Sequence, residues 1–152
     1  MRVGLIACCK EKLDHAAPAE ELYKSQLFKA SKQWITKKVD EWGILSAEHG
    51  LVLPDQVIEP YDRALSTLTR LQKERWCDYV HEQLMDKWSD NAIYMIVAGA
   101  DYRSVLSQMP YVEDVLAYWT QQRREGGMTS RRAAMSIGII KKYLKEGKGY
   151  GA

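Results

Sequence analysis

The chain has 152 residues, of which 46% are hydrophobic and 28% are charged. This length suits one ordinary domain with a single hydrophobic core, and the composition is typical of a soluble globular protein. No apolar run approaches the roughly 20 residues that a membrane-spanning helix needs, and the first residues lack the pattern of a signal peptide. We therefore expect a cytoplasmic protein without a membrane partner.

The net charge of +2 is distributed unevenly. Residues 1–40 contain eight basic residues (Lys or Arg) and five acidic ones (Asp or Glu). Residues 41–120 contain six basic and thirteen acidic residues, and residues 121–152 contain eight basic and two acidic residues. The basic last segment suggests contact with phosphates, although a solvated helix face with a basic end explains it equally well. We predict phosphate contacts from four arginines beside a Gly-Gly turn: Arg123, Arg124, Arg131 and Arg132.

The hydrophobic pattern predicts strands that alternate with helices. Short apolar runs predict strands over 2–8, 43–46 and 91–98, and 112–119 is either a strand or an irregular crossing segment. Helical spacing predicts helices over 21–39, 66–88, 102–109 and 129–145. Such alternation indicates one layered α/β domain over 1–152, with a mostly parallel central sheet of about four strands flanked by helices. The basic segment from about 121 is expected to be helical.

A long connection follows the strand at 43–46. Pro54 and Pro60 keep it out of a helix because proline and the residue before it disfavour the α region. Connections of this length inside compact domains are uncommon and usually functional. We expect this segment to form one wall of a site.

The cysteines and histidines do not indicate a metal site. Of the three cysteines, Cys8 and Cys9 are adjacent and Cys77 is isolated, which is neither a disulfide framework nor a spaced metal motif. The three histidines form no recognised ligand spacing. Cys8 continues the apolar strand and is expected in the core, whereas Cys9 faces the other way and is the better site candidate. No cofactor is indicated.

Three predicted strands end in small, polar or ionisable residues, over 8–10, 46–50 and 98–102. In α/β sheets, ligands bind beyond the carboxyl ends of the strands. Because these ends meet at one edge of a parallel sheet, we expect the three segments to converge on one site.

Four residues of this edge are candidates for catalysis. Lys12, if partly buried near a helix start, can act as a nucleophile or base, and if charged it can bind an anion. The alternative is an ordinary solvated loop lysine. A histidine beside a carboxylate can exchange protons near neutral pH, although a lone loop histidine is often only a surface residue. The predicted catalytic residues are Lys12, His49, Glu48 and Cys9.

Other residues of the same edge are candidates for substrate binding. Tyr61 and Asp62 can present a phenol and a carboxylate, unless Tyr61 packs in the core and Asp62 starts the next helix. Gly99 permits close approach of a ligand, and the helix N-terminus that follows it attracts phosphate or carboxylate. The predicted substrate-binding residues are Tyr23, Ser25, Ser46, Gly50, Tyr61, Asp62, Gly99 and Tyr102.

Four segments of the sequence carry a family resemblance. They read A-C-C-K-E-K, P-A-E-E-L-Y-K-S-Q-L-F, I-L-S-A-E-H-G-L-V-L-P-D-Q-V-I-E-P-Y-D and V-A-G-A-D-Y. Together they resemble a family of small bacterial and phage proteins related to the YaaA peroxide-stress proteins. The third segment contains the shared pattern L-S-x-x-x-G-x-x-x-P followed by P-Y, at positions Leu45, Ser46, Gly50, Pro54, Pro60 and Tyr61.

The first segment is also similar to the C-S-x-x-K-P-Y…S motif in the core domain of archaeosine synthase, which modifies a deazaguanine base in transfer RNA. Cys8, Cys9 and Lys12 fall on its Cys, Ser and Lys. The sequence departs from these patterns where Cys9 replaces the usual serine and His49 replaces a common aromatic residue.

These resemblances imply that the protein binds or modifies nucleic acid, since YaaA proteins are associated with DNA binding and with protection of DNA under oxidative stress. We predict a cofactor-independent transferase or hydrolase that acts on a nucleobase, a nucleotide or a modified base in nucleic acid. The alternatives are a non-catalytic DNA- or RNA-binding protein linked to stress protection, or a phage-type protein that binds a small nucleotide. The expected partner is nucleic acid or a nucleotide, and the oligomeric state is left open.

Overall fold

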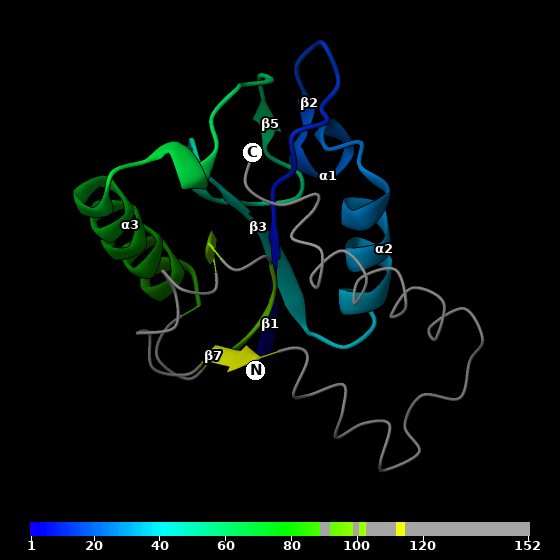
Figure 1. Ribbon diagram of the computed structural model, residues 1–152. Coiled ribbons are helices and arrows are strands. Elements are labelled where there is room, and N and C mark those ends of the chain that lie inside the picture. Colours follow the sequence, from blue (N-terminus) through cyan, green and yellow to red (C-terminus); the bar gives the residue numbers. More distant parts are fainter. Residues whose placement is uncertain (89–91, 99–100, 103–111, 115–152) are drawn as a thin grey trace.

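The computed structural model describes residues 1–88, 92–98, 101–102 and the backbone of 112–114. Within these ranges, a five-stranded sheet lies between helices (Figure 1). Its strands, in the order in which they pair, are β4 (Gly50–Val52), β3 (Glu41–Ser46), β1 (Arg2–Ala7), β6 (Ile93–Val97) and β7 (Val112–Asp114). The pairs β3–β1, β1–β6 and β6–β7 are parallel, and β4 adds an antiparallel edge. The predicted α/β fold with a mostly parallel sheet is confirmed.

The central strand β1 shows why the sequence produces a parallel sheet. Helices cover both faces of such a sheet, so its strands read as continuous apolar runs. Val3, Leu5 and Ile6 are fully buried. Leu5 lies level with Gly43 of β3 on one side and with Ile96 of β6 on the other. This register places the carboxyl ends of the three strands at one edge.

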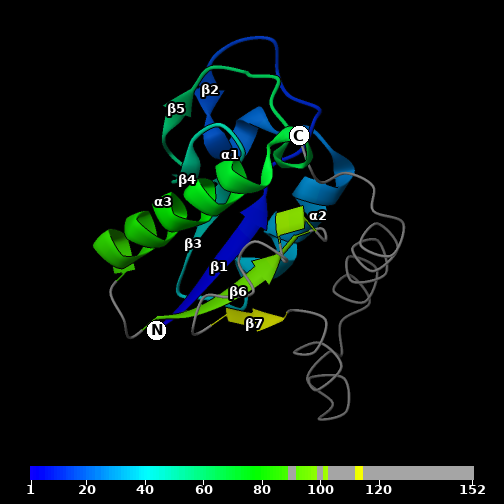
Figure 2. The same ribbon diagram turned by 60° about the vertical axis from the view of Figure 1, so that its left-hand side comes forward.

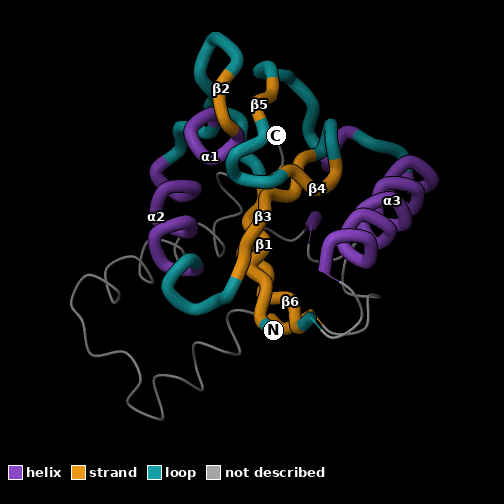
Figure 3. Tube along the Cα trace, turned by 180° about the vertical axis from the view of Figure 1, so that it is seen from behind, coloured by secondary structure: helices purple, strands orange, loops and turns teal. Residues whose placement is uncertain are grey.

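Two helices, α1 (Ala19–Leu22) and α2 (Gln26–Ile35), lie on one face of the sheet, and α3 (Arg70–Trp88) lies on the other. Figure 3 shows the strands between α2 and α3, seen from behind. The close packing of α2 depends on Gly4 of β1, because a Cβ atom there would lie 2.7 Å from the side chain of Ile35. The domain is therefore three layers deep.

The predicted helix over 21–39 is wrong at its start. The chain leaves the helical path at Tyr23, which has φ −84° and ψ 123°. Ser25 then begins α2, and its hydroxyl accepts a hydrogen bond from the backbone N–H of Phe28 at 3.0 Å. Serine is a preferred residue at this capping position because its oxygen satisfies an N–H that lacks a partner in the helix. The extended residues between α1 and α2 pair with another segment, and this pairing positions part of the candidate site.

The start of α3 also differs from the prediction. The helix begins after a short 3₁₀ turn, η1 (Leu65–Thr67), and not at residue 66. Thr69 caps it through a reciprocal pair with Gln72: each side chain accepts from the other's backbone N–H, at 3.2 and 2.9 Å. Leu71, in the first turn of the helix, is exposed. The buried residues follow a four-residue spacing and are Trp76, Val80, Leu84 and Trp88.

The connection after β3 is more regular than predicted. It contains β4 and then β5 (Val57–Ile58), which pairs with β2 (Ala17–Pro18) in a small antiparallel sheet. Figure 2 shows this small sheet beyond the end of β1 and next to α1. The two apolar pairs at 51–52 and 57–58 become strands because each finds an extended partner, which local sequence does not reveal. The connection therefore folds over the carboxyl edge of the sheet.

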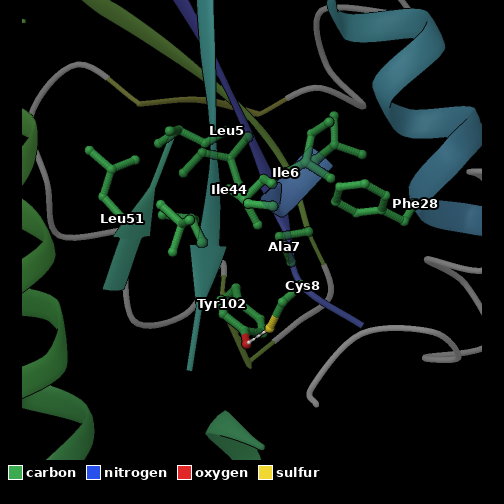
Figure 4. Packing of buried hydrophobic residues seen from close by; sticks show 14 of the residues in the cluster. Leu5, Ile6, Ala7, Cys8, Phe28, Ile44, Leu51 and Tyr102 are labelled. Carbon is green, nitrogen blue, oxygen red and sulfur yellow. Dashed lines mark hydrogen bonds between the residues drawn. The ribbon is translucent and has the colours of Figure 1, made fainter. Parts of the chain in front are cut away.

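The hydrophobic core joins the sheet to its helices. Figure 4 shows side chains of β1 and β3 packing between Phe28 of α2 and Leu51 of β4, with Cys8 and Tyr102 at the end of the strands. Of the segment predicted as a helix over 102–109, only residue 102 is described, and it is helical. The predicted helix over 129–145 and residues 115–119 lie outside the described residues. Among the described helices, none is both long and apolar enough to span a membrane.

Candidate functional site

The carboxyl ends of β1 and β3 lie side by side. The backbone N–H of Cys8, the first residue after β1, donates to the carbonyl oxygen of Leu45, the last residue but one of β3, at 2.9 Å. The segments that follow bring together most of the residues predicted for the site. We call this group the strand-end cluster, and its members are Cys9, Lys12, Tyr23, Ser25, Ser46, His49 and Tyr61.

Backbone pairing fixes the position of Lys12. The segment after β1 runs antiparallel to the extended link between α1 and α2, where Lys12 pairs with Tyr23. The N–H of Lys24 donates to the carbonyl of Glu11 at 2.9 Å, and the N–H of Leu13 donates to the carbonyl of Leu22 at 2.9 Å. This pairing places the Lys12 ammonium 4.4 Å from the ring centroid of Tyr61 and 5.8 Å from that of Tyr23. A cation at this distance over an aromatic face is attracted to it.

The surroundings of Lys12 differ from those of an ordinary surface lysine. Lys12 is half-buried, whereas Lys10 is exposed. Burial lowers the pKa of the Lys12 ammonium below its ordinary value, and Cys8, Cys9 and Asp62 offset this shift only in part. The description as a solvated loop lysine therefore fits Lys10 and does not fit Lys12.

A chain of hydroxyl groups connects three residues of the cluster. Ser46 is fully buried, and its Oγ accepts from the backbone N–H groups of Glu48 and His49 at 3.2 and 3.1 Å. The Ser46 hydroxyl donates to the Tyr61 Oη at 2.7 Å, and the Tyr61 and Tyr23 hydroxyls are 2.7 Å apart. Burial raises the pKa of both phenols above the ordinary value for tyrosine. Both tyrosines are therefore neutral near pH 7.

Cys9 is buried in the cluster, with 2% of its surface exposed. Its Sγ donates to the carbonyl of Glu11 at 3.2 Å. Burial raises the pKa of the Cys9 thiol, although hydrogen bonds from Ser25 and the charge of Lys12 act in the opposite direction. A buried thiol that donates a hydrogen bond is protonated at neutral pH, so Cys9 is a poorer nucleophile than a thiolate.

Tyr102 occupies the interior beneath the cluster. Its side chain is fully buried, and its hydroxyl lies 3.0 Å from the Sγ of Cys8 (Figure 4). The ring of Trp76 packs edge-on against it, with the centroids 5.5 Å apart. In this structure Tyr102 packs against Cys8 and Trp76, and it does not line an open surface. Its predicted neighbour Gly99 lies outside the described residues.

The remaining predicted residues lie on the outer side of the cluster. The His49 ring is half-buried and stands edge-on to Tyr61, with the centroids 5.4 Å apart. Glu48 is exposed and pairs with Arg63, 3.5 Å from the Arg63 Nη1 to the Glu48 Oε2. Asp62 is also exposed. The structure therefore brings His49 into the cluster and directs Glu48 to a surface ion pair.

The sequence did not predict how α3 holds the turn between β3 and β4. The indole N–H of Trp76 donates to the carbonyl of Ser46 at 2.9 Å. The Oε1 of Gln83 accepts from the N–H of Leu51 at 2.8 Å, and its Nε2 donates to the carbonyls of His49 and Leu51 at 3.4 and 3.3 Å. Trp76 and Gln83 are seven residues apart and so share one face of the helix. That spacing alone does not mark them in the sequence, because many pairs of residues in this helix share it.

Gly50 is the residue that makes this contact possible. Its φ is +72°, in the left-handed region that favours glycine. A Cβ atom at this position would overlap the Oε1 of Gln83 and would lie 3.1 Å from the Tyr79 ring. Gly50 was predicted to bind substrate, and in the structure its backbone forms the turn that carries Ser46 and His49.

A pocket of about 350 Å³ lies between β4 and α3. It contains none of the predicted site residues and is lined by Leu51, Leu53, Gln56, Gln83, Asp86 and Lys87. In the part of the chain that the structure describes, no three His, Cys, Asp or Glu side chains are grouped as metal ligands. The four arginines predicted to contact phosphate lie outside the described residues.

Comparison with known proteins assigns the chain to a family. A Bacillus subtilis (strain 168) protein described as "Uncharacterized protein YfjM" is 32% identical over 114 residues, which is 70% of this chain and 75% of that protein. No solved structure matches the chain significantly. The sequence pattern of a family of unknown function, DUF6884, matches residues 3–127 and so includes the whole strand-end cluster. The chain therefore belongs to the DUF6884 family.

Proposed function

We propose that this protein is an enzyme that acts on a nucleobase, a nucleotide or a modified base in nucleic acid, with Lys12 as its nucleophile or as the anchor for an anionic group of the substrate. The observation that carries this proposal is the position of Lys12. Its half-buried ammonium lies 4.4 Å from the Tyr61 ring centroid, at the carboxyl edge of the parallel sheet. Ligands of α/β proteins bind at this edge.

The chemistry of the cluster favours Lys12 over Cys9 as nucleophile. Because burial lowers the pKa of Lys12, more of it is present as the neutral amine at a given pH than for an exposed lysine. Burial raises the pKa of Cys9 and keeps the thiol protonated. His49, beside the Tyr61 ring, is the candidate acid or base for proton transfer to the substrate.

Two features support a base or nucleotide as the substrate. The Tyr61 ring stands beside the amine, and the His49 ring stands edge-on to Tyr61, so the cluster offers aromatic surfaces on which a base can stack. The sequence of the cluster also resembles the YaaA proteins and the core domain of archaeosine synthase, in which the expected targets are DNA and a transfer-RNA base. We infer a distant relation to both families, and Lys12 falls on the lysine of the synthase motif.

The test compares turnover with binding. Wild-type protein and the Lys12→Ala variant are incubated with DNA, RNA and a panel of nucleotides, and the nucleosides are then analysed by mass spectrometry. We expect a mass change that Lys12→Ala abolishes, with DNA affinity nearly unchanged. Lys24→Ala is the matched control because Lys24 is an exposed lysine of the neighbouring segment. If Lys12→Ala and His49→Ala together left turnover intact, the proposal would be wrong.

The charge of residues 121–152 favours a second candidate, a non-catalytic protein that binds DNA or RNA. This segment contains eight Lys or Arg and two Asp or Glu. Binding through it would weaken steeply with salt. Replacing the four arginines Arg123, Arg124, Arg131 and Arg132 by glutamine would then remove most of the DNA affinity, and Lys12→Ala would change nothing. The opposite pattern supports the enzyme.

A further inference from the structure

One hydroxyl proton of the strand-end cluster is not used in the hydrogen bonds between its members, and following the bonds one by one identifies it. A serine hydroxyl has one proton and two lone pairs. The backbone N–H groups of Glu48 and His49 occupy both lone pairs of the Ser46 Oγ. Its proton must therefore go to the Tyr61 Oη, 2.7 Å away.

The two phenols then share a single bond. Tyr23 and Tyr61 have one hydroxyl proton each, and the contact between them at 2.7 Å uses one of the two. The other phenol proton has no acceptor in the hydrogen bonds of the described residues. A buried donor without an acceptor costs about 1–3 kcal/mol, so the unused proton is expected on the phenol that solvent or a ligand can reach.

Exposure indicates which tyrosine presents this proton. Tyr23 is 1% exposed and Tyr61 is half-buried. If Tyr23 donates to Tyr61, the Tyr61 Oη accepts two hydrogen bonds, from Ser46 and from Tyr23, and its own proton points away from both. A phenol with two acceptor bonds and one donor bond has its full hydrogen-bonding capacity. This arrangement places the spare proton on the accessible ring.

The Lys12 ammonium lies over the same ring and is also incompletely satisfied. It donates to the carbonyl of Lys10 at 3.4 Å, and it has three N–H donors. No carboxylate of the described residues forms an ion pair with it: Glu48 pairs with Arg63, and Asp62 is exposed and makes no ion pair. Asp62 attracts Lys12 without forming an ion pair with it, so the half-buried ammonium has no directly bound carboxylate and favours an anionic ligand there.

We propose that Lys12 and the Tyr61 hydroxyl together form a binding site for an anionic oxygen, of a phosphate or a carboxylate, on the substrate. The ammonium supplies the charge and the phenol supplies a directed O–H donor. A neutral carbonyl oxygen would satisfy the donors and leave the charge unpaired, and a metal cation would be repelled by Lys12. This inference rests on the proposed function and specifies it: Lys12 is the charged anchor and not the nucleophile, and the substrate is a nucleotide, bound here through its phosphate, or a base that carries a carboxylate.

The test measures ligand binding by calorimetry to the full-length protein. The probes are inorganic phosphate, acetate, the four ribonucleoside 5′-monophosphates and the four nucleosides. We expect the monophosphates to bind at least about tenfold more tightly than the nucleosides, since a hydrogen bond to a charged group is worth about that factor. Stronger binding of inorganic phosphate than of acetate identifies phosphate as the group, and the reverse identifies carboxylate.

Two tyrosine variants test the proposed donor. Tyr61→Phe should weaken monophosphate binding about tenfold or more. Tyr79→Phe is the matched control and should bind as wild type does, since Tyr79 is 51% exposed on α3. Circular dichroism and thermal unfolding confirm that each variant is folded.

Each outcome decides between the two proposals. If Tyr61→Phe binds monophosphates as tightly as wild type, or if Tyr79→Phe loses as much affinity as Tyr61→Phe, the anion site is wrong as described. If nucleosides bind as tightly as monophosphates while Lys12→Ala still abolishes turnover, the anion site is wrong and the proposed enzyme stands. Failure of every probe to bind wild type overturns this inference too, and the turnover assay then judges the proposed function separately.

Discussion

Replacing Ser46 by alanine tests whether the hydroxyl chain holds the cluster together. The Ser46 Oγ makes three hydrogen bonds, to the Tyr61 Oη at 2.7 Å and from the N–H groups of Glu48 and His49 at 3.2 and 3.1 Å. Each contributes about 0.5–1.5 kcal/mol net. Glu48 is exposed, so a hydrogen bond to water can partly replace the one that its backbone N–H loses. We expect the free energy of unfolding to fall by about 2–3 kcal/mol.

Urea denaturation followed by tryptophan fluorescence measures this loss, since the chain has five tryptophans. Ser66→Ala is the matched control, because Ser66 is an exposed serine, and it should change stability by no more than about 0.5 kcal/mol. Combining Ser46→Ala with Tyr61→Phe should cost less than the sum of the two single changes, since both remove the same hydrogen bond. A loss below about 0.5 kcal/mol for Ser46→Ala, or strict additivity, would refute the hydroxyl chain.

Two further predictions concern the turn after β3 and the buried phenols. Gly50→Ala should lower the free energy of unfolding by about 1–3 kcal/mol, because a left-handed φ and the Gln83 amide both oppose a side chain there; a neutral effect in the same urea assay would contradict the tight turn. Burial raises the folded-state pKa of three tyrosines, Tyr61, Tyr23 and Tyr102. The free energy of unfolding that depends on their protonation is therefore fully present below about pH 10, the pKa of tyrosine in the unfolded chain, and is lost as the pH rises beyond it. Unfolding curves at increasing pH should show this loss with a smaller slope for Tyr61→Phe, and an unchanged slope would show that Tyr61 ionises normally in the folded protein.

The parallel sheet could be predicted because its signal is local to each strand. Residues 2–7 and 93–97 form continuous apolar runs, and such runs indicate strands that are buried on both faces. The rule that ligands bind beyond the carboxyl ends of strands then selected Lys12, Ser46 and Tyr61. The structure places these three residues within one hydrogen-bonded and cation–π cluster. Their catalytic and binding roles remain predictions.

The features that the sequence did not predict depend on partners distant in the chain. Tyr23 breaks the predicted helix because its backbone pairs with Lys12, eleven positions earlier in the sequence. Strand β4 exists because β3 and the Gln83 side chain pair with its two edges. A glutamine in a helix carries no sequence sign that its amide will bind a strand 32 residues away. Such tertiary contacts override local propensity.

Native mass spectrometry of the protein purified from its own host tests the central claim most directly. Wild type and the exposed control Lys24→Ala should carry a bound small molecule with the mass of a nucleotide or modified base, and it should absorb at the wavelengths of a nucleobase after release. Lys12→Ala should carry none of it. A ligand retained equally by Lys12→Ala, or one that contains no base, would contradict the assignment of the strand-end cluster as the site.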